Sequence, residues 1–128
     1  MVIDTSALVA ILLMEPDRLY FEDRIAEAQS CQISTVSYME AGMVLTTRFG
    51  TYAEAALDQM LAKARVSIVA VNAVQAKLAL AAFRDYGKGR HPAGLNFGDC
   101  FSYALAKSVG EPLLFKGSDF AQTDVDVA

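Results

Sequence analysis

Short runs of β-branched apolar residues alternate along the chain with longer runs that are rich in alanine and leucine. The short runs are typical of buried strands, and the longer runs are typical of helices. Strands are predicted at residues 2–3, 31–35, 65–71 and 112–115, with residues 123–127 as a candidate fifth strand. Helices are predicted at residues 6–14, 18–28, 36–49, 52–64, 73–86 and 97–109.

Strands that are nearly all apolar, alternating with helices, predict a parallel sheet that is covered on both faces. The predicted fold class is therefore α/β, a three-layer α/β/α sandwich around a central, mostly parallel twisted sheet of four to five strands. No repeat, linker or low-complexity segment divides the sequence, so we expect residues 1–128 to form a single domain.

The composition, with 54% hydrophobic and 20% charged residues, is that of a well-packed globular protein. A mean hydropathy of +0.30 is high for this size and predicts apolar surface covered by another chain, as in a homodimer. The longest uncharged apolar run, residues 6–14, is too short to span a bilayer, and the first residues do not resemble a signal peptide. Cys31 and Cys100 match no metal-binding spacing, which favours free thiols and a cytoplasmic protein.

Four acidic residues lie where a parallel sheet collects its ligands, beyond the carboxyl ends of strands or in the first turns of the helices. They are Asp4, Glu40, Asp99 and Asp119. Each acid also has a purely structural explanation. These explanations are an N-cap at Asp4, a capping box of Ser37 with Glu40, a similar pair of Asn96 with Asp99, and an Asx-turn at Asp119.

Taken together, the four acids favour a metal site over four separate caps. Carboxylates gathered among apolar neighbours would raise one another's pKa, and a divalent cation relieves that repulsion. An all-oxygen donor set suits Mg²⁺ or Mn²⁺ rather than Zn²⁺. The net charge of −4 would repel nucleic acid, so a nucleic-acid substrate requires metal ions, a local basic patch, or both.

Three segments together resemble a known family: "DTSAL" after the first strand, "SYMEAG" in the second quarter, and "NFGDCFSYALAKSVGEPLLFKGSDFAQTDV" near the end. The chain resembles PIN-domain ribonucleases, and more narrowly the VapC toxins of bacterial toxin–antitoxin pairs. The resemblance covers essentially the whole chain, and the C-terminal segment is its most specific part. The chain is short after "TDV", where little follows the last predicted strand.

This resemblance implies a magnesium-dependent endoribonuclease whose acidic quartet is Asp4, Glu40, Asp99 and Asp119. It implies that Asp4 and Asp99 bind the metal directly, while Glu40 and Asp119 act through water, position the nucleophile or complete a second metal site. Ser6 matches the hydroxyl that orients the first acid, and Asp124 matches a less regular acid of the family.

The resemblance also implies three partners. These are an RNA substrate, a cognate antitoxin whose helical segment binds a groove between the early helices, and a second copy of the chain. An RNase of this kind inhibits translation and growth until its antitoxin binds.

Basic residues offer candidate RNA contacts, first of all in the loop "GKGRHPAG". The candidates are Lys88, Arg90 and His91 in this loop, with Lys116 and Arg48 elsewhere. The loop charges equally suit a solvated loop without a ligand, and Lys116 is equally well placed to pair with acids.

Other functions remain as alternatives at this stage. A response-regulator receiver needs paired acids after the first strand, where this chain has "DTS", and an acid after the third strand, where it has Asn72. A haloacid-dehalogenase-type phosphatase needs an acid at the position of Ser6. A catalytically inactive PIN-fold RNA- or protein-binding module and a housekeeping RNA-processing nuclease stay open.

Overall fold

A computed structural model describes all residues, 1–128, and contains one four-stranded sheet with the strand order β3-β2-β1-β4. All three pairs of neighbouring strands are parallel. The strands are β1 (Val2–Ile3), β2 (Cys31–Ser34), β3 (Val66–Val69) and β4 (Leu113–Leu114). The helices are α1 (Thr5–Leu12), α2 (Arg18–Glu27), α3 (Thr35–Phe49), α4 (Ala53–Lys63), α5 (Ala73–Tyr86) and α6 (Phe97–Val109), with short 3₁₀ helices η1 (Gly50–Tyr52) and η2 (Phe120–Gln122).

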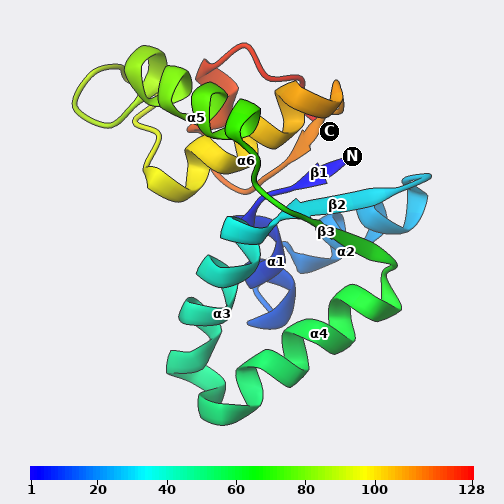
Figure 1. Ribbon diagram of the computed structural model, residues 1–128. Coiled ribbons are helices and arrows are strands. Elements are labelled where there is room, and N and C mark those ends of the chain that lie inside the picture. Colours follow the sequence, from blue (N-terminus) through cyan, green and yellow to red (C-terminus); the bar gives the residue numbers. More distant parts are fainter.

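The helices form two layers, with α5 and α6 on one side of the sheet and α1 to α4 on the other (Figure 1). Neighbouring strand residues face opposite layers, as the pleat requires. Ile3 and Leu114 belong to the hydrophobic core under α1 to α4, whereas Val2 and Leu113 belong to the core under α5 and α6. The predicted three-layer α/β sandwich is therefore confirmed.

The sheet differs from the prediction at its two ends. Residues 65–71 read as the clearest strand, but β3 is an edge strand in which Ser67 and Ile68 are exposed. The candidate fifth strand forms only an isolated parallel bridge between Leu113 and Val127.

Local sequence signals account for most helix ends. Gly110 adopts a left-handed conformation, with φ of 67°, and ends α6 where glycine has little steric penalty. α5 and α6 have the bounds that the apolar periodicity predicts.

Cys31 and Cys100 are buried free thiols in the two different cores. Among the helices, none combines the length and hydropathy that crossing a membrane requires.

Candidate active site

Asp4 directly follows β1 and is the N-cap of α1, with only 2% of its surface exposed. Its Oδ2 accepts a hydrogen bond from the backbone N–H of Ser6 at 2.9 Å and another from the Ser6 hydroxyl at 2.6 Å. Ser6 Oγ in turn accepts the backbone N–H of Lys116, which lies beyond β4. Asp4 is thus both a helix cap and a buried carboxylate fixed by Ser6.

The other carboxylate oxygen of Asp4 is held from the opposite direction by α6. The hydroxyl of Ser102 donates to Oδ1 of Asp4 at 2.6 Å. Ser37 of α3 places its own hydroxyl 3.0 Å from that of Ser102, and both serines are fully buried. Sequence reasoning missed this serine pair, although Ser102 lies three residues after Asp99 and therefore on the same side of α6.

Asp99 lies in the first turn of α6 and is 9% exposed. It forms the capping box predicted with Asn96, because each side chain accepts the backbone N–H of the other residue. Burial raises the pKa of the Asp99 carboxyl from 3.8 to about 7, against the lowering effect of the Asn96 N–H. The charges of Asp4, Glu40 and Asp119 raise this pKa further. Four acids from distant parts of the sequence therefore share one electrostatic environment.

Glu40 reaches this environment from α3, and its carboxylate lies directly against Gly98 in α6. A β-carbon at residue 98 would lie 2.1 Å from Oε2 of Glu40, so only glycine leaves room for the carboxylate there. The alternative explanation of Glu40, a capping box with Ser37, does not hold. Ser34 is the N-cap and accepts the Val36 N–H, because β2 ends at Ser34 and α3 begins at Thr35, one residue before the predicted start.

Asp119 lies in the exposed turn after β4, immediately before η2. Its side chain makes no cap hydrogen bond, in contrast to the carboxylates of Asp4 and Asp99. Among the four acids, Asp119 is therefore the exposed one.

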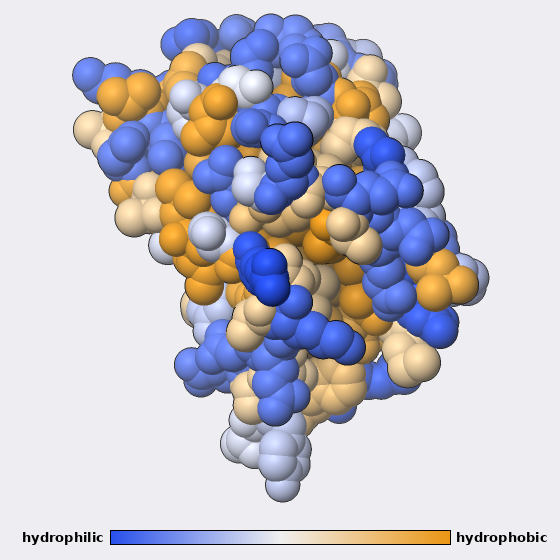
Figure 2. Space-filling view, turned by 90° about the vertical axis from the view of Figure 1, so that its right-hand side faces the viewer, coloured by the Kyte–Doolittle hydropathy of each residue, from blue (hydrophilic) through white to orange (hydrophobic).

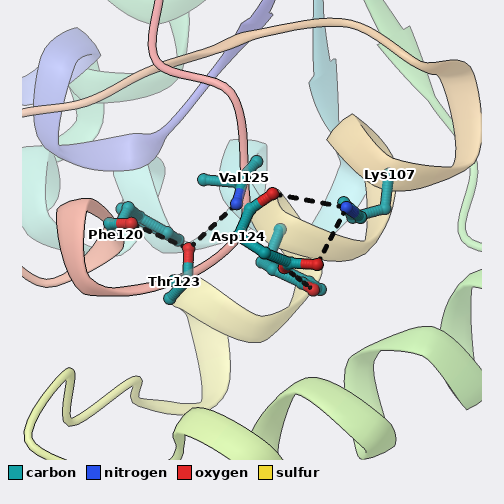
Figure 3. Close-up of polar contacts among 6 residues, drawn as sticks. Lys107, Phe120, Thr123, Asp124 and Val125 are labelled. Carbon is teal, nitrogen blue, oxygen red and sulfur yellow. Dashed lines mark hydrogen bonds and ion pairs between the residues drawn. The ribbon is translucent and has the colours of Figure 1, made fainter.

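Asp124 has a separate environment on the C-terminal tail (Figure 3). Its carboxylate accepts hydrogen bonds from the Tyr103 hydroxyl and from the Lys107 ammonium, both on α6. The Tyr103 hydrogen bond lowers the pKa of Asp124, with Lys107 adding to the effect. These contacts attach the tail to α6, and Asp124 is absent from the charges that act on Asp99.

The basic residues that are candidates for RNA contacts differ in what they contact within the molecule. The Lys116 ammonium pairs with Glu15 and Asp17, which are not among the four acids of the site. Arg48 is exposed in the last turn of α3, about 12 Å along the helix axis from Glu40.

In the loop after α5, two of the three basic side chains form hydrogen bonds with backbone groups of the chain. Arg90 Nε donates to the carbonyl of Arg84, and His91 Nδ1 accepts the Ala93 N–H while its ring packs edge-on against Tyr86. Lys88 is exposed and forms none of the ion pairs of the molecule. Lys88 is thus the loop cation whose side chain forms neither a hydrogen bond nor an ion pair within the molecule.

The four acids Asp4, Glu40, Asp99 and Asp119 are called the acid cluster below, and their donor set fits a hard divalent cation. Four carboxylates supply only oxygen ligands, and the one histidine of the chain lies in the loop after α5. No three acidic, histidine or cysteine side chains already converge on a common metal position.

Comparison with known proteins gives a consistent result. The model of the PIN domain family matches residues 1–126. The chain is 56% identical to Ribonuclease VapC30 of Mycobacterium tuberculosis H37Rv over 98% of this chain and 95% of that protein. It is 57% identical to Ribonuclease VapC of Mycolicibacterium smegmatis over 98% of this chain and 97% of that protein.

Two solved structures share the fold at low sequence identity. Mycobacterium tuberculosis VapC20, described as a sarcin–ricin loop cleaving toxin, aligns with a TM-score of 0.80 at 18% identity over 99% of this chain and 97% of that one. A toxin–antitoxin complex from Klebsiella pneumoniae aligns with a TM-score of 0.72 at 20% identity over 99% of this chain and 95% of that one.

Proposed function

The chain belongs to the PIN-domain family and, within it, to the VapC ribonucleases, and on this premise we propose that its four acidic residues Asp4, Glu40, Asp99 and Asp119 support RNA cleavage with Mg²⁺. The observation that carries the proposal is the Asp99 carboxyl, which is buried and surrounded by the charges of Asp4, Glu40 and Asp119. Such a carboxylate is stabilised in its ionised form by a nearby cation. PIN-domain ribonucleases depend on metal ions in general, and the oxygen donors here suit Mg²⁺, with Mn²⁺ as a substitute.

In this proposal Asp4 and Asp99 hold the metal, and Glu40 and Asp119 hold water or a second metal. Bound Mg²⁺ supplies an acidified water and offsets the negative charge that develops on the phosphate. Asp4 is kept in a fixed orientation by Ser6, and Asp99 by the Asn96 N–H. Asp119, which is exposed, is placed to orient water on the solvent side.

The most direct test uses purified protein free of antitoxin. RNA should be cut with Mg²⁺ or Mn²⁺ and left intact with excess chelator. In cells, expression of the chain alone should arrest growth, and co-expression of a small neighbouring reading frame should restore it. Cleavage without growth arrest would favour a housekeeping nuclease, and binding without cleavage would favour an inactive PIN-fold module.

We expect Gly98→Ala to reduce RNA cleavage about 10-fold or more without loss of stability. The added methyl group would displace the Glu40 carboxylate, which is the flexible end of a side chain, so the helices themselves need not move. The matched control is Gly42→Ala, since residue 42 lies in α3 with nothing within 4 Å of an added β-carbon. Cleavage rate and thermal unfolding are measured for both variants. Full cleavage by folded Gly98→Ala would argue against a role for Glu40.

Lys88 is the loop residue that we propose to contact RNA phosphates, with Arg90 and His91 shaping the loop and with Lys116 and Arg48 as weaker candidates. Lys88→Ala should raise KM for RNA and make the plot of log KM against log salt shallower by about 0.7, as for one lost contact to a single strand. Lys77→Ala, about 13 Å before the end of α5, is the control and should leave the slope unchanged. An unchanged slope for Lys88→Ala would contradict this contact.

For the antitoxin, we propose that a helical segment binds the hollow between α1, α2 and α4. This hollow has a volume of about 810 Å³, and Leu12, Ile25 and Met60 are among the apolar side chains that line it. Figure 2 shows the side of the molecule at the right of Figure 1, where apolar surface is exposed between polar side chains. An amphipathic helix would cover such a surface.

A second copy of the chain is proposed to cover the exposed apolar face of α5 and α6. Leu80, Phe83 and Phe97 are 66%, 41% and 75% exposed and line a hollow of about 340 Å³ that contains only apolar side chains. Leu80→Glu should shift the protein from dimer to monomer in light scattering at micromolar concentration. A dimer that persists in this variant would exclude this face as the interface.

The single domain of residues 1–128 is proposed to act in the cytoplasm.

A further inference from the structure

A pair of buried hydroxyl groups joins the three elements that carry Asp4, Glu40 and Asp99. Ser102 lies three residues after Asp99 in α6, and Ser37 lies three residues before Glu40 in α3. Both serines are 0% exposed, and their hydroxyl oxygens are 3.0 Å apart. Ser102 reaches Oδ1 of Asp4 at 2.6 Å, on the carboxylate oxygen that Ser6 does not contact.

We propose that Ser102 is a positioning residue that orients Asp4 for the metal, and that Ser37 orients Ser102. This inference rests on the proposed function, because it assigns a role to the side chains behind the acid cluster. Ser102 and Ser37 touch neither substrate nor metal in this proposal, and they act only through Asp4.

The direction of the hydrogen bonds follows from the number of protons available. An ionised carboxylate can only accept, so the single hydroxyl proton of Ser102 is committed to Asp4. The contact between the two serines is then made by the proton of Ser37, with Ser102 as acceptor. The resulting order is Ser37 to Ser102 to Asp4, which fixes the rotation of both hydroxyl groups.

The arrangement leaves Asp4 with defined donors on both oxygens and little freedom to rotate. Ser6 supplies two donors to Oδ2, and Ser102 supplies one donor to Oδ1. Removal of the Ser102 hydroxyl would leave Oδ1 without this donor in a residue that is 2% exposed. Residues that support a metal ligand in this way typically contribute a 10- to 100-fold effect on metal affinity or activity.

The test measures Mn²⁺ binding directly, by the electron paramagnetic resonance signal of free Mn²⁺, in antitoxin-free protein. Ser102→Ala should weaken Mn²⁺ binding by about 10-fold or more. Cleavage should fall at low Mg²⁺ and recover partly at high Mg²⁺, while KM for RNA is unchanged. Ser37→Ala should shift Mn²⁺ binding in the same direction by a smaller factor, because Ser102 still donates to Asp4.

The matched control is Ser108→Ala, whose hydroxyl lies on the same helix and donates to the Leu105 carbonyl. It should bind Mn²⁺ as the parent protein does. Thermal unfolding of each variant separates loss of metal affinity from loss of fold, and Ser37→Ala carries the same test should Ser102→Ala not fold.

Two outcomes overturn the inference at different levels. A folded Ser102→Ala protein that binds Mn²⁺ as tightly as the parent would make the hydroxyl pair purely structural, with the proposed function intact. A parent protein that neither binds Mn²⁺ nor cleaves RNA would overturn the proposed function, and the inference with it.

Discussion

Asp99→Asn should abolish RNA cleavage while the protein stays folded. The asparagine carbonyl can still accept the Asn96 N–H, and the backbone N–H of residue 99 still donates to the Asn96 side chain, so both hydrogen bonds of the capping box at the start of α6 are retained. The substitution removes the buried charge that we propose binds the metal. Because loss of outer-shell residues alone costs about 10- to 100-fold, loss of a direct ligand should exceed about 100-fold in kcat/KM.

The matched control for this variant is Asp124→Asn, which makes the same chemical change on the C-terminal tail. Asp124 pairs with Tyr103 and Lys107 outside the acid cluster, so its substitution should leave cleavage largely unchanged. Both variants are compared by initial rates on one RNA over a range of Mg²⁺ concentrations, with circular dichroism to confirm folding. Equal cleavage by folded Asp99→Asn and the parent would refute the assignment of the metal site.

The positions of the four acids followed from the sequence because they depend on topology rather than on side-chain contacts. Alternating strands and helices predict a parallel sheet, and the ends of parallel strands meet at one edge. Asp4 and Asp119 follow β1 and β4, which are neighbours in the sheet. Once the strands were located, the proximity of these residues required no knowledge of packing.

The serine contacts could not be predicted because they depend on where α3 begins. Ser34 and Ser37 lie one turn apart, and either could cap the helix on local preference alone. The pairing of Ser34 with Val69 keeps β2 extended up to that residue, so Ser34 becomes the cap. Ser37 is thereby turned into the interior, where it meets Ser102.

Long-range ion pairs were equally hidden in the sequence. Lys116 was a candidate for RNA binding, yet its ammonium pairs with Glu15 and Asp17, about a hundred residues earlier in the chain. The edge position of β3 was also invisible, since strand order is decided by crossovers rather than by the apolar pattern of the strand itself. Both features depend on the relative placement of elements, which periodicity does not encode.

In the absence of divalent metal, the stability of the protein should fall as the pH rises from about 4 to about 7. Asp99 has a pKa of about 7 in the folded chain, against 3.8 as the ordinary value. Between these values the folded state binds one more proton than the unfolded state, so the free energy of unfolding decreases with pH. The difference between these two pKa values, at about 1.4 kcal/mol for each tenfold change in proton affinity, gives a loss of about 4 kcal/mol in the free energy of unfolding, complete above about pH 7.

No other shifted group acts in the same pH window. The lowered pKa of Asp124 acts only in more acidic solution, where its contribution is lost as the pH falls through the folded-state pKa. The raised pKa values of the Cys31, Cys100, Tyr38, Tyr103 and Lys116 side chains act only in alkaline solution. A decrease between pH 4 and 7 would therefore report on Asp99.

Urea unfolding at several pH values, with chelator present, measures this slope. Asp99→Asn should remove it, and Asp124→Asn should retain it. Mg²⁺ should restore stability at pH 8 more than at pH 5, because a bound cation favours the ionised carboxylate that the folded protein otherwise disfavours. A parent protein with the same stability at pH 5 and pH 8 in chelator would show that the acid cluster carries no such electrostatic strain, and would remove the main argument that a cation belongs there.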